Sequence, residues 1–226
     1  MTTLTLDVGN TTVDACILDE RGFRSLGKFF HRDINKLKGK YDRVYVASVK
    51  PSFNPIIERL FGEVHFIEPK DIPLRLSFEG KEKVGVDRLL NLYGAMLFYS
   101  ENSLVVSCGT AMVLDLLVDG TFIGGFITLG LSGKLRCLAE KAELIPDIEL
   151  RRFDVAIGKD TETAVIGGIL KEARSFVLSF FQEVREGYGR DLSLIITGGD
   201  GWLLQDLGTY EPHLIHRAIL KLCKLS

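Results

Sequence analysis

The feature of this sequence that most limits its possible folds is an opening pattern of strand, glycine turn and strand that occurs twice. Residues 3–7 alternate apolar and polar side chains, residues 8–12 have the composition of a turn, and residues 13–19 resume a strand. Residues 103–128 repeat this order, with Gly109 in the first turn. Alternation with a period of two, interrupted by glycine turns, predicts antiparallel hairpins. Because the pattern occurs twice, we expect an internal duplication.

The remaining elements are predicted from apolar periodicity and from the positions of glycine and proline. Helices are expected at residues 54–61, 84–98, 132–141 and 161–186, and further strands at residues 23–30, 43–49 and 192–197. The duplication divides the chain into an N-terminal subdomain of residues 1–80 and a C-terminal subdomain of residues 81–226. A chain of this length buries enough apolar surface for a stable core.

Charge and cysteine usage argue against two classes of protein. The formal net charge is -2, whereas proteins that bind nucleic acid usually carry a basic excess or a basic stripe, so no nucleic-acid partner is expected. The four cysteines lie far apart, with no CxxC pair and no histidine at zinc-ligand spacing. Neither a disulfide framework nor a structural zinc site is therefore expected. His213 and His216 are interpreted as satisfied or solvent-exposed side chains rather than as metal ligands.

The N-terminal region has no features of a targeting segment. It enters an alternating strand directly, without a basic region followed by an apolar run. No later segment approaches the roughly 18 consecutive apolar residues that a membrane span needs. We therefore expect a cytoplasmic protein that does not bind membranes.

The first turn carries residues expected of a phosphate site. In the DVGNT segment of residues 7–11, Gly9 has no side chain and lets the backbone approach phosphate oxygens. The carboxylate of Asp7 can hold a hydrated Mg2+. The alternative is that the segment only closes a hairpin.

Two further segments favour the phosphate interpretation. The SCGTA segment of residues 107–111 stands at the equivalent place in the second half, so two glycine-threonine hairpins could hold the phosphates of one nucleotide. In the GVDR segment of residues 85–88, Asp87 could accept a proton from an alcohol and Arg88 could hold an anionic substrate. The alternative is that Asp87 caps a helix and Arg88 forms a surface ion pair.

The ordered set of segments resembles the type III pantothenate kinases across nearly the whole chain. The set comprises DVGNT, GVDR, CGTA followed by Asp115, GGFI at residues 124–127, GKDT at residues 158–161 and TGGDG at residues 197–201. The resemblance implies an α/β fold of the duplicated actin-like ATPase type, as in acetate and sugar kinases, Hsp70 and actin, with two similar subdomains and a cleft between them. It also implies ATP-dependent phosphorylation of pantothenate to 4'-phosphopantothenate, the first step of coenzyme A biosynthesis. The implied cofactors are ATP, Mg2+ and a monovalent cation, K+ or NH4+, and the implied assembly is a homodimer.

The same resemblance assigns roles to particular residues. Asp87 is the expected catalytic proton acceptor. The expected pantothenate site consists of Gly85, Val86, Asp87, Arg88 and, from the neighbouring subunit, Thr161. The expected nucleotide site consists of Asp7, Val8, Gly9, Asn10, Thr11, Thr12, Val13, Asp14, Gly109 and Thr110. The expected metal positions are Asp7 and Ser107.

At two positions the sequence departs from the family's pattern. Ser107 stands where the second phosphate loop normally begins with an aspartate, and a neutral hydroxyl is a weaker cation ligand than a carboxylate. The family's usual ligand for the monovalent cation is therefore missing, and Asp115 is the nearest alternative acid. At the second position, Leu129 replaces the proline before Gly130, which changes the rigidity of that turn.

Two other functions are compatible with these residues. A regulatory relative that binds a nucleotide without transferring phosphate would account for Ser107. An exopolyphosphatase or another small-molecule kinase of the same superfamily would keep the fold, but the GVDR segment argues against it. Measuring ADP release with and without an acceptor alcohol would separate the three functions.

Overall fold

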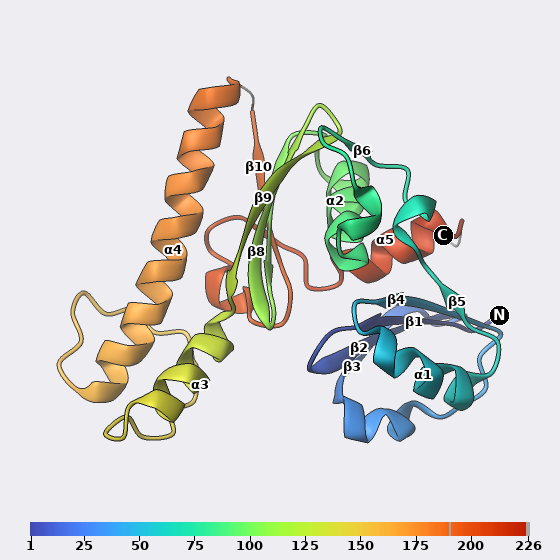
Figure 1. The fold of residues 1–226 in the computed structure, drawn as a ribbon, viewed down its shortest axis with the longest axis horizontal. Helices are drawn as coiled ribbons and strands as arrows, with labels where there is room; N and C mark the ends of the chain where they lie inside the picture. The colour runs from blue at the N-terminus through green and yellow to red at the C-terminus, as the bar shows by residue number, and fades with distance from the viewer. Residues whose placement is uncertain (190, 225–226) are drawn as a thin grey trace. The chain divides into compact units, whose positions relative to one another are not determined.

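The structure is a computed structural model that describes residues 1–189 and 191–224. The chain forms two compact units (Figure 1). Unit 1 consists of Met1–Leu97 and the segment that begins at His213, and unit 2 consists of Phe98–Pro212. The predicted division at residue 80 follows the internal repeat rather than compactness, and it stays a prediction.

Unit 1 is built on a mixed sheet with the strand order β3-β2-β1-β4-β5. The strands are β1 (Thr3–Val8), β2 (Thr12–Asp19), β3 (Gly22–Phe30), β4 (Arg43–Ser48) and β5 (His65–Phe66). Strands β1, β2 and β3 form the antiparallel meander that the alternating pattern predicts, and β4 runs parallel to β1. A further short strand is β6 (Arg75–Leu76).

The two faces of β1 differ in chemistry because successive side chains point to opposite sides of a sheet. Leu4, Leu6 and Val8 are fully buried on one face, in a cluster with Phe53 and with Ile57 of α1 (Asn54–Phe61). Figure 1 shows α1 lying across that face of the sheet. The alternate residues Thr3, Thr5 and Asp7 therefore point to the other face.

Two helices complete unit 1: α2 (Val86–Phe98) and α5 (Leu214–Leu222). Helix α5 packs against β1. Helices α2 and α5 approach closely at Gly94, where an added Cβ would lie 2.9 Å from the side chain of Leu214. The absence of a side chain at Gly94 thus allows α5, which lies near the C-terminal end of the chain, to pack against α2 in unit 1.

Unit 2 repeats the meander with a second mixed sheet, whose strands follow the order β11-β10-β7-β8-β9. These strands are β7 (Ser103–Cys108), β8 (Ala111–Val118), β9 (Thr121–Leu129), β10 (Ser193–Thr197) and β11 (Thr209–Tyr210). Two helices, α3 (Leu131–Lys141) and α4 (Thr161–Tyr188), share one core with Leu104, Val106 and Met112 of this sheet. Figure 1 shows α4 running along the sheet. The sheet face that matches Leu4, Leu6 and Val8 is thus covered by α3 and α4.

Most of the predicted elements are confirmed. The predicted helix at residues 54–61 is α1, and those predicted at 84–98, 132–141 and 161–186 differ from α2, α3 and α4 by no more than two residues at either end. Helix α5 was not predicted. The GGFI segment lies inside β9, which continues to Leu129. In the described ranges, no helix is long and apolar enough to span a bilayer.

Candidate active site

Three carboxyl groups lie close together in unit 1. Asp7 of β1 and Asp14 of β2 are directly opposite each other in the hairpin, and so share one face of the sheet. Asp87 lies in the first turn of α2, near enough to Asp7 for its charge to act on it. Burial, followed by the charges of Asp87 and Asp14, raises the pKa of Asp7 to about 7. This carboxyl group therefore holds its proton more readily than an exposed aspartate does.

The position of Asp87 is fixed by the start of its own helix. The backbone N–H of Arg88 donates to Oδ1 of Asp87 at 2.9 Å. An added Cβ on Gly85 would lie 2.5 Å from the same oxygen, so only glycine leaves room for this arrangement. Burial raises the pKa of Asp87, while the hydrogen bond and positive charge of Arg88 oppose that rise. The GVDR segment thus holds a carboxyl group of raised pKa at a helix N-terminus.

Asp14 has a different environment, although it faces Asp7. Burial alone would raise its pKa, but contact with His216 and then the charge of Lys28 hold the pKa of Asp14 below its usual value. Nζ of Lys28 lies 3.7 Å from Oδ2 of Asp14. The pair Asp7 and Asp14 therefore combines a carboxyl group of raised pKa with one that stays ionised.

The first loop, residues 9–11, is held by side chains from outside the hairpin. Nε2 of His31 lies 3.0 Å from the carbonyl oxygen of Gly9, and Nζ of Lys50 donates to the carbonyl oxygen of Asn10 at 3.1 Å. The two side chains also contact each other, with Nδ1 of His31 3.2 Å from Nζ of Lys50. These contacts orient the loop for which phosphate binding is predicted. His31 and Lys50 were missed because nothing in their local sequence connects them to residues 9–11.

The second loop, Gly109 and Thr110, is held by backbone groups of unit 2. The N–H of Gly130 donates to the carbonyl oxygen of Thr110 at 3.0 Å, and the N–H of Asp200 donates to that of Cys108 at 2.9 Å. An added Cβ on Gly130 or on Gly198 would overlap with backbone atoms of Gly109 or Cys108. The TGGDG segment therefore supports the second loop by close backbone approach.

Ser107 has no carboxylate opposite it in its own hairpin. Its direct partner in β8 is Val113, whereas its counterpart Asp7 faces Asp14. Asp115, the nearest alternative acid in the sequence, is buried within β8 opposite Val105 and Gly125. Asp115 thus lies farther from the loop end than Val113 does.

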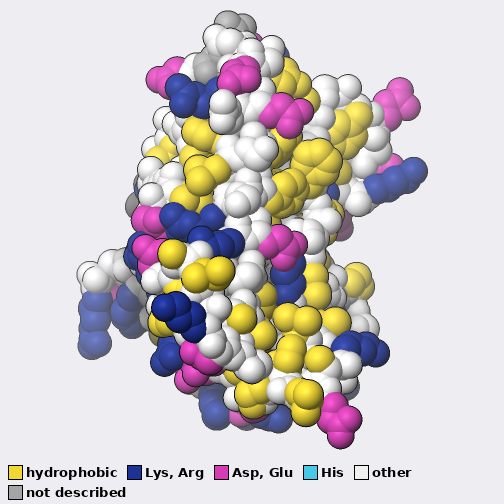
Figure 2. Space-filling model, turned by 90° about the vertical axis from the view of Figure 1, so that its left-hand side faces the viewer, with side chains coloured by type: hydrophobic (Ala, Val, Ile, Leu, Met, Phe, Trp, Pro, Cys, Tyr) yellow, Lys and Arg dark blue, Asp and Glu magenta, His cyan; other side chains and the backbone are white. Residues whose placement is uncertain are grey.

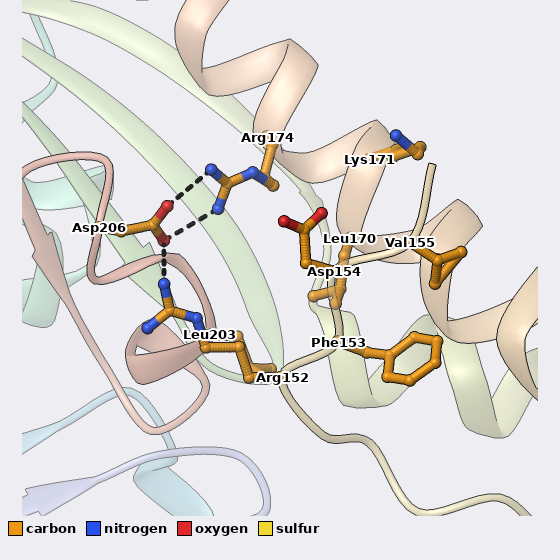
Figure 3. A pocket seen from close by; sticks show the side chains of 10 residues that line it. Arg152, Phe153, Asp154, Val155, Leu170, Lys171, Arg174, Leu203 and Asp206 are labelled. Atoms are coloured by element: carbon orange, nitrogen blue, oxygen red, sulfur yellow. Dashed lines mark hydrogen bonds and ion pairs between the residues drawn. The ribbon is translucent and has the colours of Figure 1, made fainter. Parts of the chain in front are cut away.

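Thr161 begins α4, after a capping residue. The N–H of Thr163 donates to Oδ1 of Asp160 at 2.8 Å, so Asp160 satisfies a free donor at the helix N-terminus. A polar pocket lies farther along α4, lined in part by Arg152, Arg174 and Asp206 (Figure 3). Both arginines are bound by Asp206, with the two nitrogens of Arg174 at 2.7 and 2.9 Å. These three charged side chains form a structural network in unit 2.

His216 of α5 was interpreted from sequence as satisfied or exposed, and the structure shows it fully buried. Its Nδ1 lies 2.8 Å from Oγ1 of Thr5. Its Nε2 lies 3.5 Å from Oδ1 of Asp14. Burial lowers the pKa of His216, and the neighbouring Asp14 opposes this effect. Because α5 was not predicted, its contact with β1 and β2 was not foreseen.

The structure thus brings together part of the predicted site. Asp7, Asp14 and Asp87 gather in unit 1, next to the first loop and the GVDR segment. Gly109, Thr110 and Thr161 belong to unit 2. The assignments of these residues to nucleotide, pantothenate and metal remain predictions.

Nearly the whole chain is similar in sequence to known proteins. A family model described as "Type III pantothenate kinase" matches residues 3–183. The chain is 34% identical over 222 residues to the type III pantothenate kinase of Aquifex aeolicus, covering 98% of this chain and 97% of the relative. It is 28% identical over 229 residues to that of Borrelia hermsii, covering 90% and 85%.

Solved structures show likeness of fold alone. A Baf family protein from Campylobacter jejuni matches with a TM-score of 0.66 at 19% identity, covering 98% of this chain and 97% of that one. The ethanolamine utilization protein EutJ from Carboxydothermus hydrogenoformans matches with a TM-score of 0.52 at 13% identity, covering 98% and 82%.

Proposed function

This chain belongs to the type III pantothenate kinase family, and we propose here how its own residues carry out the reaction. The protein is a transferase that phosphorylates pantothenate in coenzyme A biosynthesis and binds ATP. Its actin-like ATPase fold consists of two α/β subdomains, each with a mixed sheet. The roles of individual residues are inferred from the contacts and charges around them.

Asp87 accepts the proton of the substrate alcohol. The observation that carries this assignment is a carboxyl group of raised pKa, fixed by the N–H of Arg88 and grouped with Asp7. A general base works best when its pKa lies near the operating pH. The 4'-hydroxyl proton passes to Asp87, the hydroxyl oxygen bonds to the γ-phosphorus, and ADP leaves with the bridging oxygen. Positioning and charge neutralisation supply the catalysis.

Pantothenate binds at the start of α2. The guanidinium group of Arg88 pairs with the carboxylate of pantothenate, since arginine forms forked hydrogen bonds to such groups. Gly85 and Val86 line the same site, where the lack of a side chain at Gly85 keeps Asp87 in place. Thr161 at the start of α4 completes the site from a neighbouring subunit.

Asp7 fits a divalent cation. Burial and two nearby carboxyl groups raise its pKa to about 7, so a cation would relieve an unfavourable concentration of negative charge. Oxygen ligands such as carboxylates suit Mg2+. When bound, Mg2+ would neutralise charge on the nucleotide phosphates. Residues 8–14 supply backbone N–H groups and hydroxyls to the same phosphates.

The second loop contributes neutral groups to nucleotide binding. Gly109 offers space and Thr110 offers a hydroxyl, in a loop that Gly130 and Asp200 hold by hydrogen bonds. Ser107 offers only a hydroxyl where a carboxylate would hold K+ or NH4+ more strongly. We therefore expect this enzyme to depend weakly on monovalent cations.

A homodimer is proposed because Thr161 acts in the partner's site. Figure 2 shows hydrophobic side chains among charged ones on the side of unit 2 that carries α4. The large exposed hydrophobic side chains of unit 2 include Phe126, Ile127, Leu129 and Leu178. Apolar groups exposed on β9 and α4 are suited to burial between two copies.

A cytoplasmic location of the enzyme is likewise a proposal.

The deciding experiment measures ADP release from Mg-ATP with and without pantothenate. Parallel assays in K+, NH4+ and Na+ at equal ionic strength test the role of Ser107. We expect pantothenate-dependent release that changes little among the three cations. Nucleotide binding without pantothenate-dependent release would contradict the assignment, and strong K+ dependence would contradict the role given to Ser107.

A further inference from the structure

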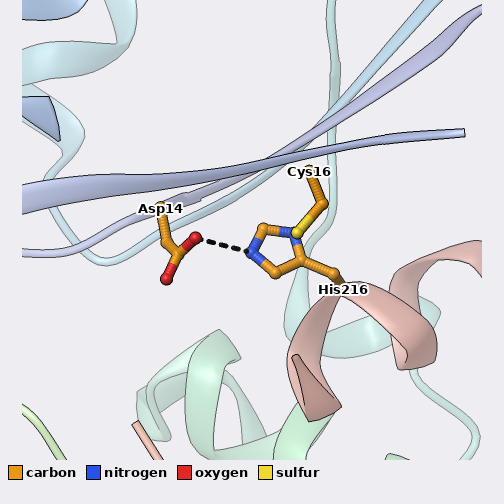
Figure 4. A group of neighbouring side chains, drawn as sticks. All are labelled: Asp14, Cys16 and His216. Atoms are coloured by element: carbon orange, nitrogen blue, oxygen red, sulfur yellow. Dashed lines mark ion pairs between the residues drawn. The ribbon is translucent and has the colours of Figure 1, made fainter. Parts of the chain in front are cut away.

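Three side chains that can bind a metal converge in unit 1, on the face of the sheet that α5 covers. Asp14 and Cys16 come from β2, and His216 comes from α5 (Figure 4). Their candidate ligand atoms all lie within 4.8 Å of one another. Sequence spacing could not reveal this group, because two of its members lie on an early strand and the third on a helix that was not predicted.

Two buried atoms in this group lack hydrogen-bond partners. Within the described residues, neither Oδ1 of Asp14 nor Nε2 of His216 makes a hydrogen bond, although both are inaccessible to solvent. They face each other at 3.5 Å, marked by the dashed line in Figure 4. A charge-assisted hydrogen bond would bring such atoms to about 2.7–2.9 Å. In a tetrahedral site with ligand bonds of about 2.0–2.2 Å, oxygen and nitrogen ligands lie about 3.3–3.5 Å apart.

The imidazole of His216 is oriented in the way that metal-binding histidines usually are. Its Nδ1 lies 2.8 Å from Oγ1 of Thr5, and the Thr5 hydroxyl also donates to the carbonyl oxygen of Cys16 at 3.3 Å. With that hydroxyl proton directed to Cys16, Nδ1–H donates to Thr5 and the lone pair of Nε2 points to Asp14. Such an outer hydrogen bond fixes the ring and its tautomer for a metal on the other nitrogen.

Cys16 determines which cations suit this group. Its side chain is fully buried, and its sulfur is a soft ligand. A cation with affinity for sulfur suits such a ligand better than Mg2+ does. Sγ of Cys16 also lies 3.8 Å from Nδ1 of His213, which offers a fourth donor. Lys28 lies 3.7 Å from Oδ2 of Asp14, the carboxylate oxygen that does not face His216.

We propose that Asp14, Cys16 and His216 form a binding site for a divalent cation of the zinc type, distinct from the Mg2+ position at Asp7. The mixed oxygen, sulfur and nitrogen ligands suit zinc or cobalt and do not suit Mg2+. An occupied site would also fix Asp14, which faces Asp7 across the hairpin. The proposal goes beyond the kinase reaction, and binding can be measured without turnover.

The test is a titration of the metal-free, full-length protein with Zn2+ and with Co2+ in excess Mg2+. The exposed Cys137 is replaced by serine throughout, to remove adventitious binding. We expect one equivalent of Zn2+ per chain, thermal stabilisation by Zn2+, and thiolate-to-cobalt charge-transfer absorption with Co2+. Cys16→Ser should abolish that absorption, whereas Cys108→Ser, which alters a buried cysteine of β7, should retain it.

Further variants separate metal binding from a structural role. His216→Gln should weaken Zn2+ binding by at least about tenfold. Thr5→Val removes only the outer hydrogen bond and should weaken Zn2+ binding by no more than about 100-fold. If His216→Gln does not fold, the comparison of Cys16→Ser with Cys108→Ser still decides. No stoichiometric binding, or equal Co2+ spectra in those two variants, would overturn the proposal and leave a proton shared between Asp14 and His216.

Discussion

In unit 1 the hairpin of β1 and β2 places Asp7 opposite Asp14, whereas in unit 2 the hairpin of β7 and β8 places Ser107 opposite Val113. The strand pairing is the same in both hairpins. In each, the second-to-last residue of the first strand faces the third residue of the second strand. The acidic residues, however, are found at these positions only in unit 1. The two copies of one backbone pattern therefore carry different chemistry.

The loops of the two hairpins are also supported differently. The first loop is held by the side chains of His31 and Lys50, and an added Cβ on Gly9 would lie 3.3 Å from the carbonyl oxygen of Thr12. The second loop is held by backbone contacts of Gly130 and Gly198, where an added Cβ would overlap with the loop. Side-chain contacts can adjust more readily than backbone contacts. The two hairpins thus differ both in the acidic residues they carry and in the groups that hold their loops.

The largest difference between the units should appear when a carboxylate of unit 1 is removed. Asp87→Asn should lower kcat by about 100- to 10,000-fold, because it removes the general base. Ser107→Ala should lower kcat by less than about tenfold, which corresponds to less than about 1.4 kcal/mol of activation free energy. Steady-state ADP release measures both, with circular dichroism to verify folding.

Asp33→Asn is the matched control for that pair, since Asp33 pairs with the exposed side chains of Arg32 and Lys36 in unit 1. Near-normal turnover in Asp87→Asn would remove Asp87 as the base. Similar losses in Asp87→Asn and Ser107→Ala would remove the functional contrast between the units.

A smaller loss of activity is expected when Asp87 is displaced rather than removed. In Gly85→Ala the new Cβ would lie 2.5 Å from Oδ1 of Asp87, so the carboxyl group must move. A shift of about 1 Å in a reacting group can cost about 100-fold in rate, and we expect kcat to fall by about 10- to 100-fold. Gly187→Ala, on an open part of α4, should leave kcat unchanged. Unaltered kcat in Gly85→Ala would contradict the proposed fit between Gly85 and Asp87.

The difference in loop support predicts a difference in stability. Gly130→Ala forces a Cβ against the carbonyl oxygen of Gly109 and should lower the free energy of unfolding by about 1–3 kcal/mol. Gly9→Ala should cost less, because its nearest contact is 3.3 Å away. Urea denaturation monitored by circular dichroism compares the two variants. A larger loss in Gly9→Ala would reverse the proposed roles of the loops.

Ser107→Asp makes the second hairpin resemble the first. A carboxylate at this position should strengthen cation binding, so K+ should stimulate the variant more than the wild type, by about tenfold or less. ADP release is compared in K+ and Na+ at equal ionic strength, with Ser107→Asn as a neutral control. Equal cation responses in Ser107→Asp and Ser107→Asn would show that the charge at position 107 does not select the cation.

The smallest effect is expected from the ion pairs of Asp206 with Arg152 and Arg174 in unit 2. Hydrogen bonds from Arg174 lower the pKa of Asp206 to about 2. A lowered pKa stabilises the fold above the unfolded value near 4, and this contribution disappears as the pH falls through about 2. Because Asp206 is partly exposed, Asp206→Asn should cost less than about 1 kcal/mol at neutral pH.

The measurement is the difference in urea stability between wild type and Asp206→Asn across this pH range. It should be constant above about pH 5 and should shrink toward pH 2. A difference that grows on acidification would show that the sign is wrong.

The sequence predicted the hairpins and most helices because their signals are local. Alternating side chains in β1 and β7 and the glycines after them require no distant partner to be recognised. The GVDR segment was likewise recognised in place, since Asp87 is fixed by the adjacent Arg88 and Gly85. The local pattern therefore located Asp87, while its role as the base came from the family resemblance and stays a proposal.

Contacts between distant segments were not predictable in the same way. His31 and Lys50 support the first loop from other elements, and His216 reaches Thr5 and Asp14 only because α5 packs on β1. The apolar spacing of α5, with Leu214, Ile215, Ala218 and Ile219 buried, was a usable signal for the helix. Nothing in that spacing indicated which strand the helix would contact.

The return of α5 to unit 1 has a consequence for synthesis on the ribosome. Unit 2 is one uninterrupted segment, Phe98–Pro212, and all of it emerges before α5 does. Unit 1, by contrast, cannot close its second face until α5 has been translated and has packed beside Gly94. The part of the enzyme made first is therefore the last to finish folding, and a nascent chain carries β1 with its polar face uncovered until translation of α5 is complete.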